Sequence, residues 1–225
     1  MRRNTLLIAM VALLVLCFAT LAACSGNVAK VDDYVEKLNT KDDFITILEE
    51  STDTYTKVTE VLISGNRIQV LSVKTIEGQD KAERDDKYYE VLDDTHVRVY
   101  STFECTEHAK GDKPVTEWKY DDITVTENYL TKARAELRDM ASKFALKGDD
   151  LEWSKEKEGF VYVNGKGATE SDYTDVVVNA ASGALKIDYK NEGVSSKVSY
   201  MNFGTARVSF PILCKTYQNK LDGKE

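Results

Sequence analysis

The chain has 225 residues, of which 42% are hydrophobic and only 2 are proline, a composition typical of a folded globular domain and unlike that of a disordered stalk. Its formal net charge is −8, which excludes a protein that binds nucleic acid or an anionic lipid surface mainly through charge. The length corresponds to one domain, or at most two.

The N-terminal segment has the features of a secretory signal. Arg2 and Arg3 precede the apolar run TLLIAMVALLVLCFATLA, and no further charge appears before Lys30. The stretch LAACSG (residues 21–26) then places small residues directly before Cys24. The LAAC sequence resembles the lipobox of bacterial lipoproteins, in which the cysteine receives a diacylglycerol and becomes the new N-terminus.

The resemblance implies that residues 1–23 are a lipoprotein signal peptide and that lipidated Cys24 anchors the protein on the extracytoplasmic face of the cell membrane. Several acyl chains on one residue would make this anchor stable. Loss of residues 1–23, which contain two arginines and no acidic residue, leaves a net charge of −10. Two alternatives stay open: a signal cleavage site that holds a cysteine by chance, and an uncleaved membrane-spanning helix.

Residues 24–39 are expected to form the lipidated cysteine and a polar tether, with room for a short helix at VDDYVEKL (31–38). If Cys24 carries lipid, Cys105 and Cys214 remain after processing. A disulfide between them would persist in an exported protein. Each could equally be a small buried side chain, so the sequence leaves both states open.

The folded domain is expected to begin with a short amphipathic helix in KDDFITILEES, residues 41–51. Thr40 suits its N-cap, and Phe44, Ile47 and Leu48 fall on one helical face. After residue 51 apolar and polar residues alternate with a period of two, which is typical of strands. Residues 54–73 predict a hairpin that turns at Gly65-Asn66, and residues 87–104 predict a second hairpin that turns at Asp93-Asp94, with a charged loop (77–86) between them.

A second helix is predicted in TENYLTKARAELRDMASKFAL (residues 126–146), where apolar residues recur at helical spacing. Thr126 suits its N-cap, and Gly148 suits its C-terminal stop. Strands follow to the end of the domain: a hairpin within residues 152–165, a pair within 172–190, and a last pair at 196–204 and 206–211, which Pro211 ends. Helix, strands, helix and strands in this order predict an α+β fold, an antiparallel sheet with helices on one face.

The closing stretch SYMNFGTARVSFP (residues 199–211) resembles the last strand pair of small lipoproteins of the LolA/LprG-like superfamily. The resemblance covers residues 40–211. It implies an incomplete antiparallel β-barrel, a half-barrel with helices packed on its concave face, and an apolar cavity that holds lipid acyl chains in members of the family. Two features depart from the pattern: the tail, residues 212–225, runs past the usual end, and Phe210 stands where leucine is expected.

The sequence offers little for catalysis, so the chain is interpreted as a non-enzyme without a cofactor. His96 and His108 are its two histidines. The run ECTEH (104–108) lacks the second ligand cluster of a zinc site, and NGKG (164–167) lacks the spacing of a phosphate loop. A hydrolase would need a histidine beside a buried carboxylate at the mouth of a pocket.

Three functional hypotheses result. The first is a lipoprotein that binds a lipid or another amphiphile in an apolar cavity. The second is an envelope interaction protein with a filled core that docks an unidentified protein partner. The third, an envelope hydrolase, has the weakest support. The 12 tyrosines suit half-buried strands better than a sugar-binding surface.

Overall fold

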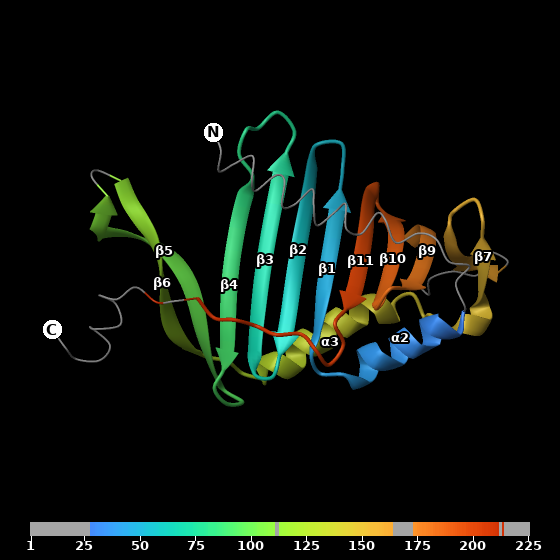
Figure 1. Cartoon of the computed structure of the whole chain (residues 1–225), viewed down its shortest axis with the longest axis horizontal. Helices are drawn as coiled ribbons and strands as arrows, with labels where there is room; N and C mark the ends of the chain where they lie inside the picture. Colours follow the sequence, from blue (N-terminus) through green and yellow to red (C-terminus); the bar gives the residue numbers. More distant parts are fainter. Residues whose placement is uncertain (1–27, 111–112, 164–172, 212, 214–225) are drawn as a thin grey trace.

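The computed structural model describes residues 28–110, 113–163, 173–211 and 213, and for residues 103–110 and 113–116 it describes the backbone alone. This part of the chain forms an antiparallel sheet of eleven strands, accompanied by helices α2 (Ala29–Thr40) and α3 (Tyr129–Ser142) and the short 3-10 helix η1 (Gly148–Asp150) (Figure 1). The sheet does not close, because β6 and β7 form its two edges. The predicted α+β class with an open antiparallel sheet is confirmed.

The strands form two meanders that meet in the middle of the sheet. The spatial order is β6-β5-β4-β3-β2-β1-β11-β10-β9-β8-β7, so the first strand pairs with the last. The strand bounds are β1 (Phe44–Ser51), β2 (Tyr55–Ser64), β3 (Arg67–Ile76), β4 (Glu83–Val91), β5 (His96–Lys110), β6 (Lys113–Thr124), β7 (Leu151–Ser154), β8 (Gly159–Tyr162), β9 (Tyr173–Ala181), β10 (Ala184–Asn191) and β11 (Val194–Met201).

The hairpins predicted within residues 54–73, 87–104, 152–165 and 172–190 are confirmed where the structure describes them. Ser64 pairs with Arg67, which leaves Gly65-Asn66 as the two-residue turn between β2 and β3. Gly65 has a φ of 58°, a left-handed conformation that glycine adopts without strain. The β4–β5, β7–β8 and β9–β10 hairpins also form at the expected places.

The helix predicted at residues 41–51 is wrong, because β1 occupies this stretch. Phe44 and Thr46 are buried on one face of the strand and Ile47 on the other. A strand that is covered on both faces shows no strict alternation of polar and apolar residues, so its pattern can imitate a helical stripe. The three consecutive β-branched residues 45–47 favour the strand.

Three other segments differ from expectation. The loop predicted at 77–86 is shorter, since β4 begins at Glu83. Strand β6 was not predicted; adjacent aspartates and a proline obscure its alternation. The strand predicted at 206–211 is wrong: β1 and β10 already pair with both edges of β11, so a hairpin after β11 has no free edge to join.

Part of the segment expected as a tether is folded. Residues 29–39 belong to α2, where Val31 is fully buried and Leu38 is 1% exposed, and both side chains belong to the main hydrophobic cluster. The Asp32 carboxylate accepts a hydrogen bond from the backbone N–H of Gly148 at 2.8 Å. The polar residues of this segment lie on the exposed side of α2, and its larger apolar residues lie on the buried side.

Helix α3 is the helix predicted in mid-chain, but it is shorter at both ends. Asn128, rather than Thr126, caps it, and its side chain accepts a hydrogen bond from the Thr131 N–H at 2.9 Å. The helix ends at Ser142, and Gly148 lies further on in η1. A Cβ added at Gly148 would collide with the Asp32 carboxylate and the Val28 side chain, so a larger residue here would displace the carboxylate that accepts the Gly148 N–H.

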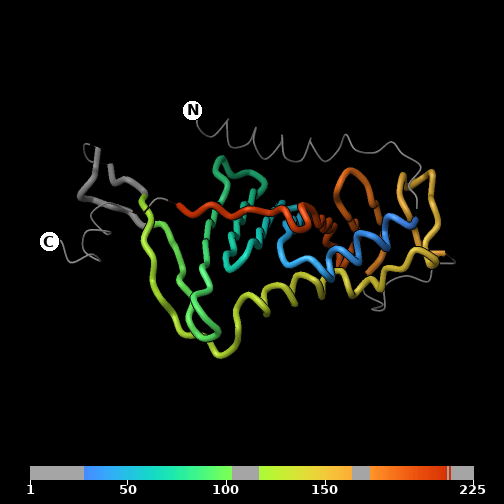
Figure 2. The backbone as a smooth tube through the Cα atoms, turned by 60° about the horizontal axis from the view of Figure 1, so that its bottom comes forward, coloured from blue at the N-terminus to red at the C-terminus, as the bar shows by residue number. Residues whose placement is uncertain are grey.

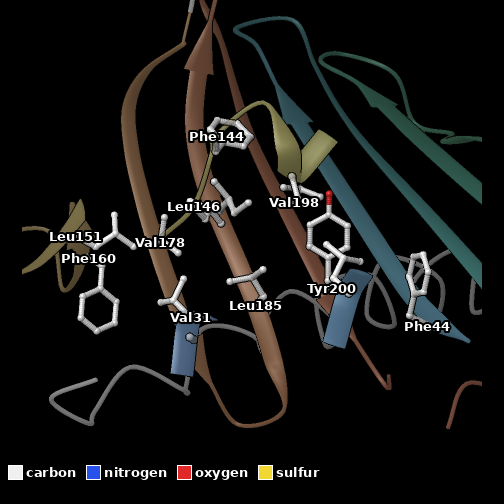
Figure 3. Packing of buried hydrophobic residues seen from close by; sticks show 14 of the residues in the cluster. Val31, Phe44, Phe144, Leu146, Leu151, Phe160, Val178, Leu185, Val198 and Tyr200 are labelled. Atoms are coloured by element: carbon white, nitrogen blue, oxygen red, sulfur yellow. The ribbon is translucent and has the colours of Figure 1, made fainter. Parts of the chain in front are cut away.

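A single hydrophobic cluster joins the sheet to both helices. Its largest fully buried side chains include Tyr200, Phe44, Phe144 and Phe160, and Figure 3 shows several of them between the strands and the helices. The Tyr200 hydroxyl donates a hydrogen bond to the Leu137 carbonyl of α3 at 3.0 Å. Leu185 and Ile187 of β10 are fully buried on the same face of the strand.

After β11 the chain makes a turn at residues 203–205 and then crosses the sheet without regular secondary structure; residues 202–211 are here called the strap (Figures 1 and 2). Phe210 of the strap stacks on Tyr100 of β5, whereas Tyr129 of α3 contacts Tyr89 of β4. Tyr100 pairs with Tyr88, and successive residues of a strand point to opposite faces. The strap and α3 therefore lie on opposite faces of β4.

Candidate functional site

The candidate site is the line along which α3 meets the sheet, here called the α3 seam. Its members are apolar side chains that are only partly buried and that pack against the main cluster: on the sheet Leu48, Val61, Val70 and Tyr89, and on α3 Tyr129, Ala133, Leu137 and Met140. Apolar binding sites in proteins typically combine such side chains with a few polar groups.

Strand register places the sheet members of the seam on one face. Val61 pairs with Val70, and Leu48 pairs with Thr59, two residues before Val61. Tyr89 pairs with Ile68, two residues before Val70. Because alternate residues share a face, the four side chains form a continuous strip across β1 to β4.

Helix α3 supplies the opposite wall. Ala133, Leu137 and Met140 follow Tyr129 at intervals of four, four and three residues, which places all four on one side of the helix. The Tyr129 ring lies 5.1 Å from the Tyr89 ring, centroid to centroid. Further along α3, the carbonyl of Leu137 accepts a hydrogen bond from the hydroxyl of Tyr200 in β11, so α3 spans the strands from β4 to β11.

A fully buried polar group lies within this apolar surface. Thr46 of β1 is 1% exposed and faces Val61 on one side and Tyr200 on the other. Among the described residues, its Oγ1 has no hydrogen-bond partner. It is one of five buried side-chain oxygens without a hydrogen-bond partner in the described part of the chain, whereas buried hydroxyls are nearly always hydrogen-bonded.

The phenols around the seam are poor acids. Burial, together with the neighbouring Tyr89, raises the pKa of Tyr129 to about 12. Burial also raises the pKa of Tyr200 above its usual range. Both hydroxyls therefore stay neutral at physiological pH, and the seam presents an uncharged surface with hydroxyl groups at its two ends.

The residues singled out from the sequence do not come together at the seam. Cys24 and Cys214 lie outside the described residues, as does the NGKG run, and for Cys105 and His108 the structure describes only a place in β5. The lipidation and the disulfide therefore stay predictions.

His96, the remaining histidine, is exposed at the start of β5. Its Nδ1 lies 3.0 Å from Asp93 Oδ1, and the Asp93 carboxylate is also exposed. Hydrogen bonds from the Thr95 backbone and the His96 side chain lower the pKa of Asp93 to about 2. This arrangement fixes a hairpin turn and does not meet the requirement for a histidine beside a buried carboxylate.

Two further observations bear on chemistry. In the described portion of the chain, no three His, Cys, Asp or Glu side chains gather closely enough to hold a metal ion. None of the helices within the described ranges is both long and apolar enough to cross a membrane.

No protein-family model matches the chain, and no curated protein is significantly similar to it. The seam is therefore defined by the structure alone. Sequence reasoning predicted α3 and its apolar stripe, but it missed Thr46 and Tyr89, since neither has a local signal for its neighbours across the sheet.

Proposed function

We propose that the chain is an extracytoplasmic lipoprotein that is anchored to the cell membrane through lipidated Cys24 and binds a lipid or another amphiphile along the α3 seam. It acts as a binding protein and not as an enzyme. The proposed fold family is the LolA/LprG-like superfamily, in which a half-barrel carries helices on its concave face. The open eleven-stranded antiparallel sheet supports this assignment.

The observation that carries the proposal is the combination of partly exposed apolar side chains with the unpartnered hydroxyl of Thr46. An acyl chain laid along the seam would remove apolar surface from water, at about 0.8 kcal/mol for each buried CH₂. An ester or carboxyl oxygen of the same molecule would accept a hydrogen bond from the Thr46 hydroxyl. An amphiphile offers both kinds of contact.

The test is native mass spectrometry, with solvent extraction, on residues 25–225 produced without the lipid anchor. We expect a co-purifying lipid in stoichiometric amount. Val70→Phe adds volume inside the seam, so it should reduce the bound fraction several-fold. Leu71→Phe is the matched control, because Leu71 is the next residue of β3, is also half-buried, and points to the other face.

A bare mass that stays unchanged after incubation with membrane lipids would reject the proposal. Equal loss of lipid in both variants would instead mean that overpacking, not occupation of the seam, causes the effect. The second candidate function, an envelope protein that docks a protein partner, is favoured by the filled cluster around Tyr200 and Phe144 (Figure 3). It predicts no bound lipid in any variant.

A further inference from the structure

The strap ends in an aromatic contact on the face of the sheet opposite the α3 seam. The Phe210 ring stacks on Tyr100, with centroids 4.7 Å apart and planes 25° apart, and meets Tyr88 edge-on at 6.2 Å. The guanidinium carbon of Arg67 lies 4.5 Å from the centroid of the same ring. Phe210 is thus held by a tyrosine stack and a cation–π contact.

The surface beneath Phe210 is a row of aromatic side chains across three strands. Tyr88 pairs with Tyr100, and Tyr100 pairs with Tyr120, so the three rings lie on one face of β4, β5 and β6. Trp118 adds an edge-on contact to Tyr88 at 5.1 Å. Tyr88, Tyr100, Tyr120 and Trp118, together with Arg67, are here called the aromatic row.

The strap is tied to the fold by a hydrogen bond and an ion pair near its start and by apolar side chains further on, where Ala206 is 1% and Val208 7% exposed. The Gly204 N–H donates to the Asp43 carbonyl at 2.6 Å, and Arg207 lies 3.8 Å from the Asp43 carboxylate. Within the described part of the chain, no hydrogen bond joins residues 208–211 to the sheet. Phe210 therefore depends on side-chain contacts, which an equivalent side chain from another molecule could make equally well.

We propose that the aromatic row is a docking site for an extended segment of a partner protein that presents an aromatic side chain followed by proline, and that the strap occupies this site in the absence of the partner. The strap shows the chemistry that the row accepts. Pro211 restricts Phe210 to extended backbone, which lowers the entropy lost when such a segment docks. This inference does not depend on the α3 seam, which lies on the other face.

Because the strap of the same chain occupies the aromatic row, it lowers the apparent affinity of the row for the partner segment. A segment tethered to its own site has an effective concentration on the order of mM, so a free segment must displace it. If the free segment binds the empty row with a Kd of about 0.1 mM, an effective concentration of about 1 mM makes its binding to the occupied row about tenfold weaker. Removal of the Phe210 side chain should therefore strengthen binding in trans.

The experiment uses the full chain in wild-type form and as Phe210→Ala, with a fluorescein-labelled synthetic peptide that has the sequence of residues 205–211. Fluorescence anisotropy should give saturable binding to Phe210→Ala and binding about tenfold weaker to the wild type. A peptide in which the phenylalanine is replaced by alanine is the matched control and should not bind. Circular dichroism of both proteins establishes that the variant is folded.

A second variant keeps the test decisive. Phe210→Ala combined with Tyr100→Ala removes the stacking partner and should lose the peptide at least tenfold. The proposal is overturned if folded Phe210→Ala binds neither peptide, or binds both equally. It is also overturned if the wild type forms a concentration-dependent dimer that Phe210→Ala abolishes, because the occupant would then be the strap of a second copy.

Discussion

Thr46→Val tests whether the buried hydroxyl at the seam lacks a partner in the ligand-free protein. Valine has nearly the shape of threonine and places a methyl group where Oγ1 lies. A buried hydroxyl without a hydrogen bond costs about 1–3 kcal/mol, and Thr46 is 1% exposed. We therefore expect the free energy of unfolding to rise by roughly 1–2 kcal/mol, which corresponds to about 2–4 °C in Tm per kcal/mol for a domain of this size.

The assay is thermal and urea denaturation of solvent-extracted protein, followed by circular dichroism. Thr59→Val is the matched control, since Thr59 lies on the same face of the sheet, is half-buried, and has Ser72 Oγ 3.4 Å from its hydroxyl. Its stability should change by less than about 0.5 kcal/mol, or fall. A Thr46→Val protein that is less stable than wild type would refute the reasoning, because the hydroxyl would then have a partner, such as a bound water, that valine cannot keep.

Three further predictions concern the fold around the sites. Tyr200→Phe should lower the free energy of unfolding by about 0.5–1.5 kcal/mol in urea denaturation, because it removes the hydrogen bond to α3. Gly148→Ala should destabilise by about 1–3 kcal/mol in the same assay, since the added Cβ collides with the α2 carboxylate that accepts its N–H. In an NMR titration Asp93 should show a pKa of about 2; since the Thr95 and His96 hydrogen bonds lower this pKa, the stabilisation they give is present above pH 4 and is lost as the pH falls towards 2.

The sequence was most informative where structure depends on neighbours in the chain. The Gly65-Asn66 turn fixes the β2–β3 hairpin through local backbone geometry, and it forms where it was predicted. The apolar stripe of α3 likewise needs only helical spacing. Each of these features could be predicted because its cause lies within a few residues.

The errors lie where distant partners decide. Phe44–Ser51 is a strand because β11, about 150 residues later in the chain, pairs with its second edge. The sequence of residues 41–51 does not indicate that this partner exists. The strap is the reverse case: its sequence suits a strand, but both edges of β11 are already taken. Local propensity is a weak guide in both places because the pairing pattern of the whole sheet overrides it.

The candidate site could not be predicted from the sequence for the same reason. Thr46 has no unusual sequence context, and its burial depends on Val61 and Tyr200, which lie on either side of it in two different strands. Tyr89 and Tyr129 are 40 positions apart in the chain, and only the crossing of α3 over β4 brings their rings together. A site made of such pairs has no sequence motif.

Strand β4 shows how one element can serve two separate surfaces. Tyr88 belongs to the aromatic row under the strap, and Tyr89, the next residue, belongs to the α3 seam. Because neighbouring residues of a strand point to opposite faces, a ligand in the seam and a segment on the row cannot touch each other. The two proposals can therefore fail separately: Val70→Phe acts on the seam face alone and Phe210→Ala on the strap face alone, so an effect of either variant on both kinds of binding would mean that the sheet itself has changed shape.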